Sequence, residues 1–291
     1  MLKFLFSFFL VLSICFAEIQ WQVSTQEISV GQTIRIDVFS SAPIKTSKIF
    51  FAGRTFSMFL TDSELNQELF HYVSYVALSR KKNSGVYPVY MKFFSEGETY
   101  QTSFNVTADH QHIKKGKVKL TKKKQKLMKK QKTLNKEAQE ILAAFSIITD
   151  RAFFMKNAFI LPVQGRISSK FAADRLYSGG RRRSHAGVDL VNNLGSPIVA
   201  PHSGRVVLSE SYAYHGESIM IDHGYGIVSI FNHLRQRHVF VGDRVQQGEL
   251  IGTLGESGLV SGAHLHWGLA VHNIRVDPLY WVNNRELSRS F

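Results

Sequence analysis

Alternating hydrophobic and polar residues predict a β-rich N-terminal part. The segments 19–23 and 34–38 alternate strictly, and the segments 89–94 and 100–106 resemble the two strands of a hairpin. Short strands separated by turn residues are typical of a sandwich of two sheets. We therefore predict that residues 18–107 form a small β-sandwich-like domain, in a chain that is mainly β.

A helical pattern follows the predicted sandwich. Between residues 112 and 150, hydrophobic residues recur every seven positions, with two more at the intermediate spacing, as on one face of a helix. The residues of this stripe are Leu120, Leu127, Leu134, Ile141 and Ile148, with Ala138 and Phe145. We predict one long helix within a basic helical linker of residues 108–156. This helix either connects two domains or folds back onto one of them.

The C-terminal part returns to a β pattern. Short apolar runs at 197–199, 204–208, 218–222 and 227–231 are separated by glycine-containing turns, which leave little room for helices. Nine of the twelve histidines lie from residue 185 onward. This is therefore the part of the chain expected to carry chemistry.

The chain begins with the pattern of an export signal. Residues 1–17 contain a lysine, an apolar run over 4–12 and a small residue at Ala17, which predicts a secretory signal peptide cleaved after Ala17. The alternatives are a membrane anchor, for which the run is short, and lipidation of Cys15, beside which a bulky isoleucine is unfavourable. Cys15 is the only cysteine, so the mature chain would have no disulfide and no thiolate metal site.

Composition and charge describe a globular protein with one strongly basic segment. The 291 residues are 44% hydrophobic and 20% charged, enough for two modest domains. The net charge of +14 comes mostly from residues 114–136, which hold twelve lysines and no acidic residue. This segment is either a solvated helix face or a contact for an anionic partner. Export argues against nucleic acid and favours the cell envelope, and lysine repulsion argues for a monomer rather than a parallel coiled coil.

Two short motifs carry metal-ligand residues. His185 and Asp189 form an H-x-x-x-D motif, and His264 and His266 form an H-x-H motif later in the chain. Imidazole nitrogens and carboxylate oxygens are common zinc ligands, and a catalytic zinc site keeps one position for water. Each motif alone is weak, because two histidines on a solvated strand give the same pattern. Together they predict a zinc site.

Further segments, in the same order, give residues 161–276 a close resemblance to the lysostaphin/LytM-type zinc metallopeptidases, which cut peptidoglycan peptides. The matching segments are GRISSKF at 165–171, HAGVDL at 185–190, VAP at 199–201, GRV at 204–206, IDHGYG at 221–226, FNHL at 231–234, VGDRV at 241–245, GESG at 255–258 and GAHLH at 262–266. The resemblance implies a LytM-type β domain over residues 157–284 with a groove for one zinc ion, and a C-terminal tail of residues 285–291. A sandwich and a helical linker before such a domain resemble the envelope enzymes that determine cell shape in curved and helical bacteria.

The resemblance also implies roles for five residues. At the matching positions His185, Asp189 and His266 would be the zinc ligands. His264 and His233 would act on the water that zinc activates and on the developing oxyanion.

Three more residues match family positions near the substrate. We expect Arg175 and Asn232 to contact substrate, and His223 to line the groove or to be structural rather than to bind metal. Two departures from the family bear on these contacts. Ala172 and Ala173 replace a glycine common before Arg175, and Asn232 stands where the family often has tyrosine.

The resemblance implies a secreted, periplasmic enzyme of cell-wall remodelling, cell shape or division. Its reaction would be D,D-endopeptidase cleavage of D-Ala–diaminopimelate cross-links in peptidoglycan, with D,D-carboxypeptidase activity as an addition. One alternative is a non-enzymatic LytM-type activator of a cell-wall amidase, and another is a wall-binding protein with a vestigial site. The complete set of ligands and working histidines favours the enzyme.

Overall fold

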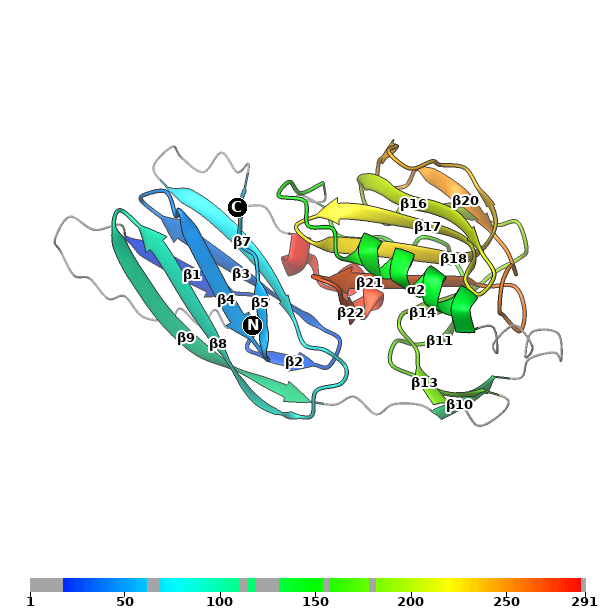
Figure 1. The fold of residues 1–291 in the computed structure, drawn as a ribbon, viewed down its shortest axis with the longest axis horizontal. Coiled ribbons are helices and arrows are strands. Elements are labelled where there is room, and N and C mark those ends of the chain that lie inside the picture. The colour runs from blue at the N-terminus through cyan, green and yellow to red at the C-terminus, as the bar shows by residue number, and fades with distance from the viewer. Residues whose placement is uncertain are drawn as a thin grey trace.

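The structure is a computed structural model that describes residues 18–61, 69–109, 115–118, 131–153, 157–177 and 182–288. The predicted signal peptide of residues 1–17 lies outside the described residues. Figure 1 shows two β domains side by side, with helix α2 on the front of the C-terminal one. None of the helices in the described ranges is long and apolar enough to cross a membrane.

The N-terminal domain is a sandwich of two sheets. The first has the order β1-β3-β7-β6 and the second β2-β9-β8-β4-β5. The strands are β1 (Ile19–Val23), β2 (Glu27–Ser29), β3 (Thr33–Ser40), β4 (Thr46–Phe51), β5 (Arg54–Phe56), β6 (Phe59–Leu60), β7 (Phe70–Ala77), β8 (Gly85–Ser95) and β9 (Glu98–Asp109). Strands β8 and β9 bury every second residue over much of their length, as the alternation in the sequence predicts. The mainly β fold is confirmed.

The C-terminal domain is built on a ten-stranded sheet. Its main path is β11-β14-β21-β18-β17-β16-β19; β15 and β20 pair with each other, β20 also pairs with β18, and β22 pairs with β21. The strands are β11 (Arg166–Ser169), β14 (Val188–Val191), β15 (Pro197–Val199), β16 (Gly204–Tyr212), β17 (Gly216–Gly224), β18 (Ile227–Arg237), β19 (Arg244–Val245), β20 (Leu250–Leu254), β21 (Leu265–Val271) and β22 (Ile274–Val276). Helix α3 (Pro278–Asn283) and the 3-10 helix η1 (Arg285–Ser288) follow. Central strands β17 and β18 are buried on both faces over most of their length, which fits the apolar runs at 219–221 and 227–228.

The predicted single long helix is wrong in its first part. Residues Lys115–Val118 form strand β10, which pairs in parallel with β12 (Asp174–Tyr177), and β12 pairs with β13 (Arg182–Ser184). A helix occupies only Gln131–Phe145, as α2, and the first two stripe positions lie outside the described residues. Pairing with a distant strand overrides the local helical pattern at 115–118.

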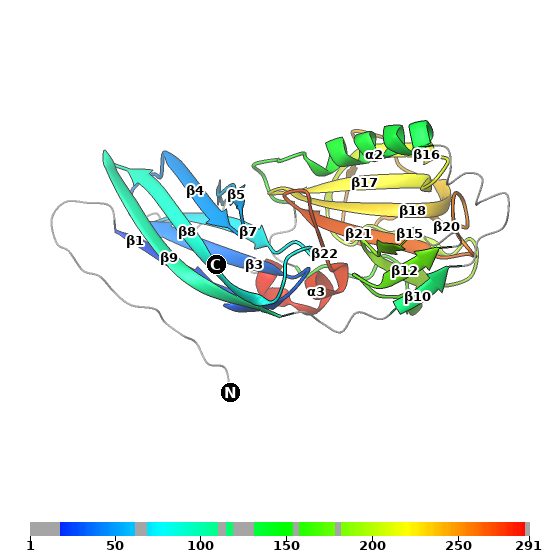
Figure 2. The same cartoon turned by 60° about the horizontal axis from the view of Figure 1, so that its bottom comes forward.

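Helix α2 packs on the sheet of the C-terminal domain (Figure 2). Its Ile141, Ala144 and Phe145 share a small core with sheet residues, and the guanidinium carbon of Arg275 lies 3.2 Å from the centre of the Phe145 ring. The predicted stripe is rotated, because Glu137 is buried and Ala138 is exposed.

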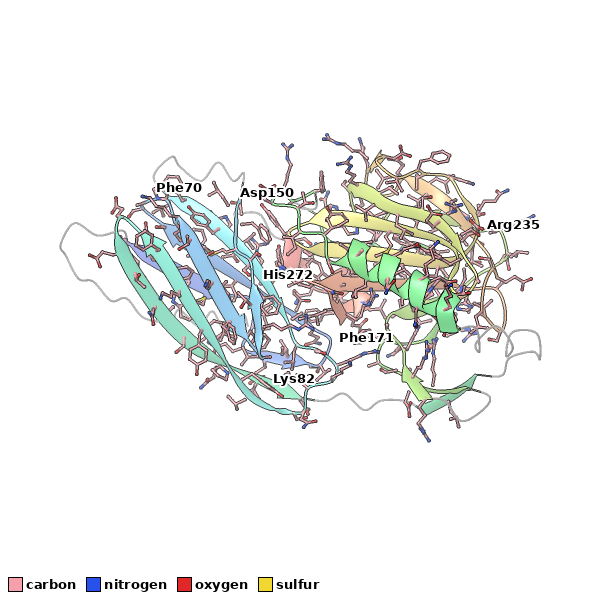
Figure 3. The ribbon with its side chains drawn as sticks, viewed as in Figure 1. Phe70, Lys82, Asp150, Phe171, Arg235 and His272 are labelled. Carbon is pink, nitrogen blue, oxygen red and sulfur yellow. The ribbon has the colours of Figure 1, made fainter. Side chains whose placement is uncertain are left out.

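The two domains share one hydrophobic core. Trp281 of α3 is fully buried, stacks obliquely on Tyr75 of the sandwich and donates from Nε1 to Thr33 Oγ1 at 3.2 Å. The described part of the predicted C-terminal tail, η1, also joins this contact, since Leu287 is buried and its carbonyl accepts a hydrogen bond from Tyr75 Oη at 2.7 Å. His272 lies where the domains meet (Figure 3), against the ring of Phe59. The domains therefore form one packed unit.

Candidate metal centre

Strand pairing brings the two metal-ligand motifs together. Strand β14 carries Asp189 and pairs antiparallel with β21, so that Asp189 lies directly opposite His266. His185 precedes β14 across Gly187, where a Cβ atom would come 2.3 Å from the Trp267 carbonyl oxygen. Only glycine fits this close approach, which explains the glycine between the two ligands of the first motif.

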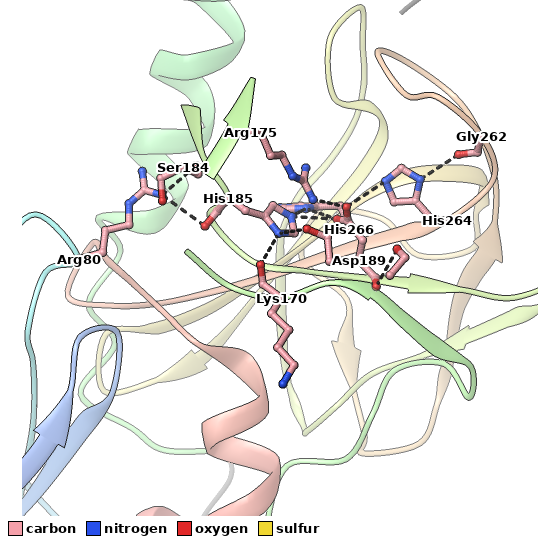
Figure 4. A network of polar contacts seen from close by, with 11 residues as sticks. Arg80, Lys170, Arg175, Ser184, His185, Asp189, Gly262, His264 and His266 are labelled. Atoms are coloured by element: carbon pink, nitrogen blue, oxygen red, sulfur yellow. Dashed lines mark hydrogen bonds and ion pairs between the residues drawn. The ribbon is translucent and has the colours of Figure 1, made fainter. Parts of the chain in front are cut away.

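Three potential ligand atoms converge at one point (Figure 4). His185 Nε2 lies 2.9 Å from Asp189 Oδ1 and 2.9 Å from His266 Nδ1, and His266 Nδ1 lies 3.0 Å from Asp189 Oδ1. Ligand atoms bound tetrahedrally to one zinc ion lie about 3.3 Å apart, so an ion needs shifts of only a few tenths of an ångström. Among the described residues, these three side chains place their ligand atoms close enough together to bind one metal ion. The three side chains fit a metal ion.

A backbone carbonyl fixes the tautomer of His185. Its Nδ1 donates to the Lys170 carbonyl oxygen at 2.9 Å, which can only accept. The lone pair of the neutral ring is therefore on Nε2, facing the carboxylate of Asp189, and two electron-rich atoms at this distance favour a cation between them.

Asp189 is ionised and held on both of its oxygens. Burial alone would raise its pKa, but the polar contacts with the His185 and His266 rings outweigh burial, so the pKa of Asp189 lies well below its ordinary value. Arg175, on β12, donates from Nη2 to Asp189 Oδ2. One carboxylate oxygen thus faces the metal position and the other is neutralised by a guanidinium.

Two further histidines flank the three ligand residues. His264 Nδ1 donates to the Gly262 carbonyl oxygen at 2.8 Å, and His233 Nδ1 donates to the Ser257 carbonyl oxygen at 2.9 Å. The centres of their rings lie 5.1 Å apart, and His264 Nε2 lies 3.8 Å from Asp189 Oδ2. Since Nδ1 carries the proton in both rings, Nε2 is left as a proton acceptor. Burial and the nearby His264 and His266 also hold the pKa of His233 well below its ordinary value.

The structure changes the interpretation of the three predicted substrate contacts. The guanidinium of Arg175 pairs with Asp189, as described above, rather than facing a substrate. Asn232 is 3% exposed and accepts a hydrogen bond from Ser218 Oγ at 3.0 Å. His223 is fully buried; its Nδ1 donates to the Ser203 carbonyl oxygen, and its Nε2 accepts from Ser229 Oγ, each at 2.8 Å. A fully buried ring cannot line the groove, so the burial of His223 argues against the groove-lining expectation and favours its structural alternative.

The sequence analysis missed the groups that orient the histidines. Lys170, Gly262 and Ser257 each contribute a backbone carbonyl to a ring Nδ1. Every residue type has this group, so no side-chain pattern identifies such partners. Only the three-dimensional neighbourhood of each ring does.

Comparison with known proteins supports this site. Residues 183–278 match Peptidase family M23. The chain is 39% identical over 127 residues to "Peptidoglycan DD-endopeptidase ShyC" of Vibrio cholerae, covering 43% of this chain and 29% of ShyC. It is 34% identical over 115 residues to "Peptidoglycan DD-endopeptidase ShyA" of the same organism, covering 39% of this chain and 27% of ShyA. The chain thus aligns with less than a third of the length of either relative.

A solved structure of a candidate peptidase M23 from Pseudomonas aeruginosa shares the fold over most of the chain. It has a TM-score of 0.60 at 23% identity and covers 82% of this chain and 89% of its own. The matched region 183–278 contains the three converging ligand residues and both flanking histidines. The region that matches Peptidase family M23 therefore holds the candidate metal ligands, and it carries the motifs that resemble lysostaphin/LytM-type peptidases.

Proposed function

We propose that this protein is a zinc-dependent peptidoglycan hydrolase, and specifically a D,D-endopeptidase that cuts D-Ala–diaminopimelate cross-links, with D,D-carboxypeptidase activity as an addition. The observation that carries the proposal is the convergence of His185 Nε2, Asp189 Oδ1 and His266 Nδ1 beside two histidines with the same tautomer. The names of ShyC and ShyA support peptidoglycan as the substrate and a DD-endopeptidase reaction, over the region in which they align with this chain.

Zinc is the metal that the donor set favours. Two imidazole nitrogens and one carboxylate oxygen, with no thiolate among them, suit zinc with an open position. When bound, zinc would supply Lewis-acid polarisation of a water molecule and of the scissile carbonyl group.

Histidine side chains of the protein would carry out the proton transfers. The Nε2 atoms of His264 and His233 are the acceptors beside the site, since both Nδ1 atoms are engaged. One ring removes a proton from the attacking water, and the resulting imidazolium has an N–H to give to the oxyanion or the leaving amine. Arg175 keeps the second oxygen of Asp189 paired and oriented throughout.

A complete site is the reason to prefer an enzyme over a non-enzymatic amidase activator or a wall-binding protein. Neither alternative requires a set of metal ligands, so neither explains why His185, Asp189 and His266 converge. In this chain the set is complete and supported by carbonyl contacts.

The cellular setting belongs to the same proposal. We place the protein in the periplasm as a monomer, exported by its N-terminal segment, with the Lys-rich segment 114–136 attracted to the anionic envelope.

The test is mass spectrometry of muropeptides released from purified sacculi, with and without a chelator. We expect cross-linked dimers to fall and monomers to rise, chelator to stop the reaction and zinc to restore it. Unchanged muropeptides with zinc-loaded protein would refute the proposed activity. Loss of terminal D-Ala without loss of dimers would make it a carboxypeptidase instead.

A further inference from the structure

Helix α2 buries one carboxylate against the catalytic domain. The side chain of Glu137 is 5% exposed, although its neighbours on this helix face are apolar. Its two oxygens accept from the Tyr214 backbone N–H at 3.1 Å each, and Oε2 accepts from His215 Nδ1 at 3.0 Å. Burial raises the pKa of Glu137, but the bonds from His215 and Tyr214 bring it below its ordinary value, so the group stays ionised.

The residues that Glu137 holds form the turn between β16 and β17, and this turn holds His233. The His215 carbonyl oxygen accepts from the backbone N–H of His233 at 3.0 Å. His233 has φ of +68°, a left-handed conformation that costs a residue with a side chain about 1 kcal/mol or more. Such a conformation persists only where its surroundings fix it.

The same turn also supports the ring of His233. Gly216 packs so closely on Ser257 that a Cβ atom would come 2.2 Å from Ser257 Oγ. Ser257 Oγ accepts from the Glu217 backbone N–H at 2.9 Å and donates to the Leu234 carbonyl oxygen at 2.6 Å. The carbonyl of Ser257 is the acceptor for His233 Nδ1. Both the backbone and the ring of His233 therefore depend on the turn that Glu137 anchors.

Docking of the helix does not require this carboxylate. Ile141, Ala144 and Phe145 already bury the C-terminal half of α2, and Arg275 covers the Phe145 ring. Burying a charge is costly unless each oxygen is paired. The specific pairing with Tyr214 and His215 is thus better explained by orientation of the turn than by attachment of the helix.

We propose that Glu137 is a positioning residue, which acts through the Tyr214–His215 turn to set the orientation of His233. Helix α2 lies outside the matched region 183–278, so part of the reaction site would come from the segment before that region. This inference rests on the proposed function, since it assigns His233 a role in that reaction.

The test compares three variants of the full-length, zinc-loaded protein on a soluble cross-linked muropeptide. Glu137→Ala should lower kcat about ten-fold or more with KM and zinc content unchanged, because small misplacements of a reacting group are costly. Glu137→Gln keeps one acceptor oxygen and should fall between this variant and wild type. The control is Gln139→Ala on the same helix, whose side chain is exposed, and it should behave as wild type.

A second readout is independent of turnover. In ¹⁵N-histidine-labelled protein, Glu137→Ala should shift the backbone amide and Nδ1–H signals of His233 and leave those of His264 in place. Unchanged His233 signals in the folded variant would overturn the proposal, as would a fall in kcat that only follows loss of zinc. A wild-type protein that leaves the muropeptide intact would instead refute the proposed function, while the His233 signals still test the coupling to Glu137.

Discussion

His185 Nε2 and His266 Nδ1 lie 2.9 Å apart, although 81 residues separate them in the chain. The antiparallel pairing of β14 with β21 creates this contact, because it sets Asp189 opposite His266. A one-residue change of register would turn the His266 side chain to the other face of the sheet. The metal site therefore depends on the register of the sheet that carries it.

Removal of any one ligand side chain should abolish metal binding and activity together. His185→Ala, Asp189→Ala and His266→Ala each leave two of three protein ligands, too few for a tetrahedral site with one open position. We expect purified variants to contain little zinc by elemental analysis and to cut sacculi no faster than the chelated wild type. The control is His238→Ala, an exposed histidine away from the site. Full zinc occupancy in Asp189→Ala would contradict the ligand assignment.

His264→Ala should separate metal binding from turnover. The ring lies beside Asp189 without being one of the three converging ligands, so we expect zinc content near that of wild type. Loss of a proton-transfer group should lower kcat by about 10² to 10⁴. Zinc analysis and muropeptide release on the same preparation check both parts, and cleavage at the wild-type rate would show that His264 has no catalytic role.

The sequence identifies the metal site more completely than its surroundings. His185, Asp189, His264 and His266 are recognisable because ligand chemistry and spacing are local properties of the chain. The contact of Arg175 with Asp189 depends instead on the fold bringing β12 within side-chain reach of β14, and the burial of His223 depends on how the sheet is packed. Both features depend on tertiary structure and leave no local pattern in the sequence.

The linker shows the same limit of sequence analysis for the prediction of secondary structure. The helical stripe correctly places a helix at 131–145 but also extends it over 115–118, which pair in parallel with β12. Hydrophobic spacing reports which face of an element is apolar. It does not report a partner strand some sixty residues away, nor the rotation of α2 that buries Glu137.

Arg175→Ala should weaken metal binding rather than substrate binding. Arg175 neutralises Asp189 Oδ2, and loss of such a partner of a ligand usually lowers metal affinity by about 10- to 100-fold. We expect a matching increase in the zinc dissociation constant, measured by chelator competition, with KM unchanged at saturating zinc. Arg175→Lys keeps the charge but loses the planar fork and should be intermediate. A raised KM with normal zinc affinity would restore the original expectation of a substrate contact.

Acid should destabilise the fold through buried histidines such as His223. Burial lowers the pKa of His223 from 6.5 to about 3, and His202 adds to this shift. Between pH 6.5 and about 3 the unfolded chain binds a proton here that the folded chain does not, so stability falls as pH falls. The contribution of this residue is about 1.4 kcal/mol per pH unit in that window, and it is absent above pH 7.

The measurement is chemical unfolding of wild type and His223→Gln between pH 7.5 and 4.5. The variant should be less stable at pH 7.5, because it loses the paired bonds to Ser203 and Ser229. It should also lose less stability on acidification than wild type does. Parallel pH curves for the two proteins would show that His223 is not the titrating group.

The two domains should unfold as one unit, because Trp281 fills the shared core. This side chain is fully buried, contacts Tyr75 and bonds to Thr33 of the sandwich. Trp281→Ala should cost about 3 to 5 kcal/mol of unfolding free energy, whereas Trp281→Phe keeps most of the volume and should cost clearly less. Because the substitution removes a fluorophore, thermal unfolding followed by circular dichroism is a more suitable measurement than tryptophan fluorescence. A single transition that shifts downward in Trp281→Ala is expected, and two separate transitions in the wild type would show that the shared core does not couple the domains. The same contact means that a chain starting near Lys156 lacks Tyr75 and Thr33 and would expose Trp281, so its activity would also report lost stability.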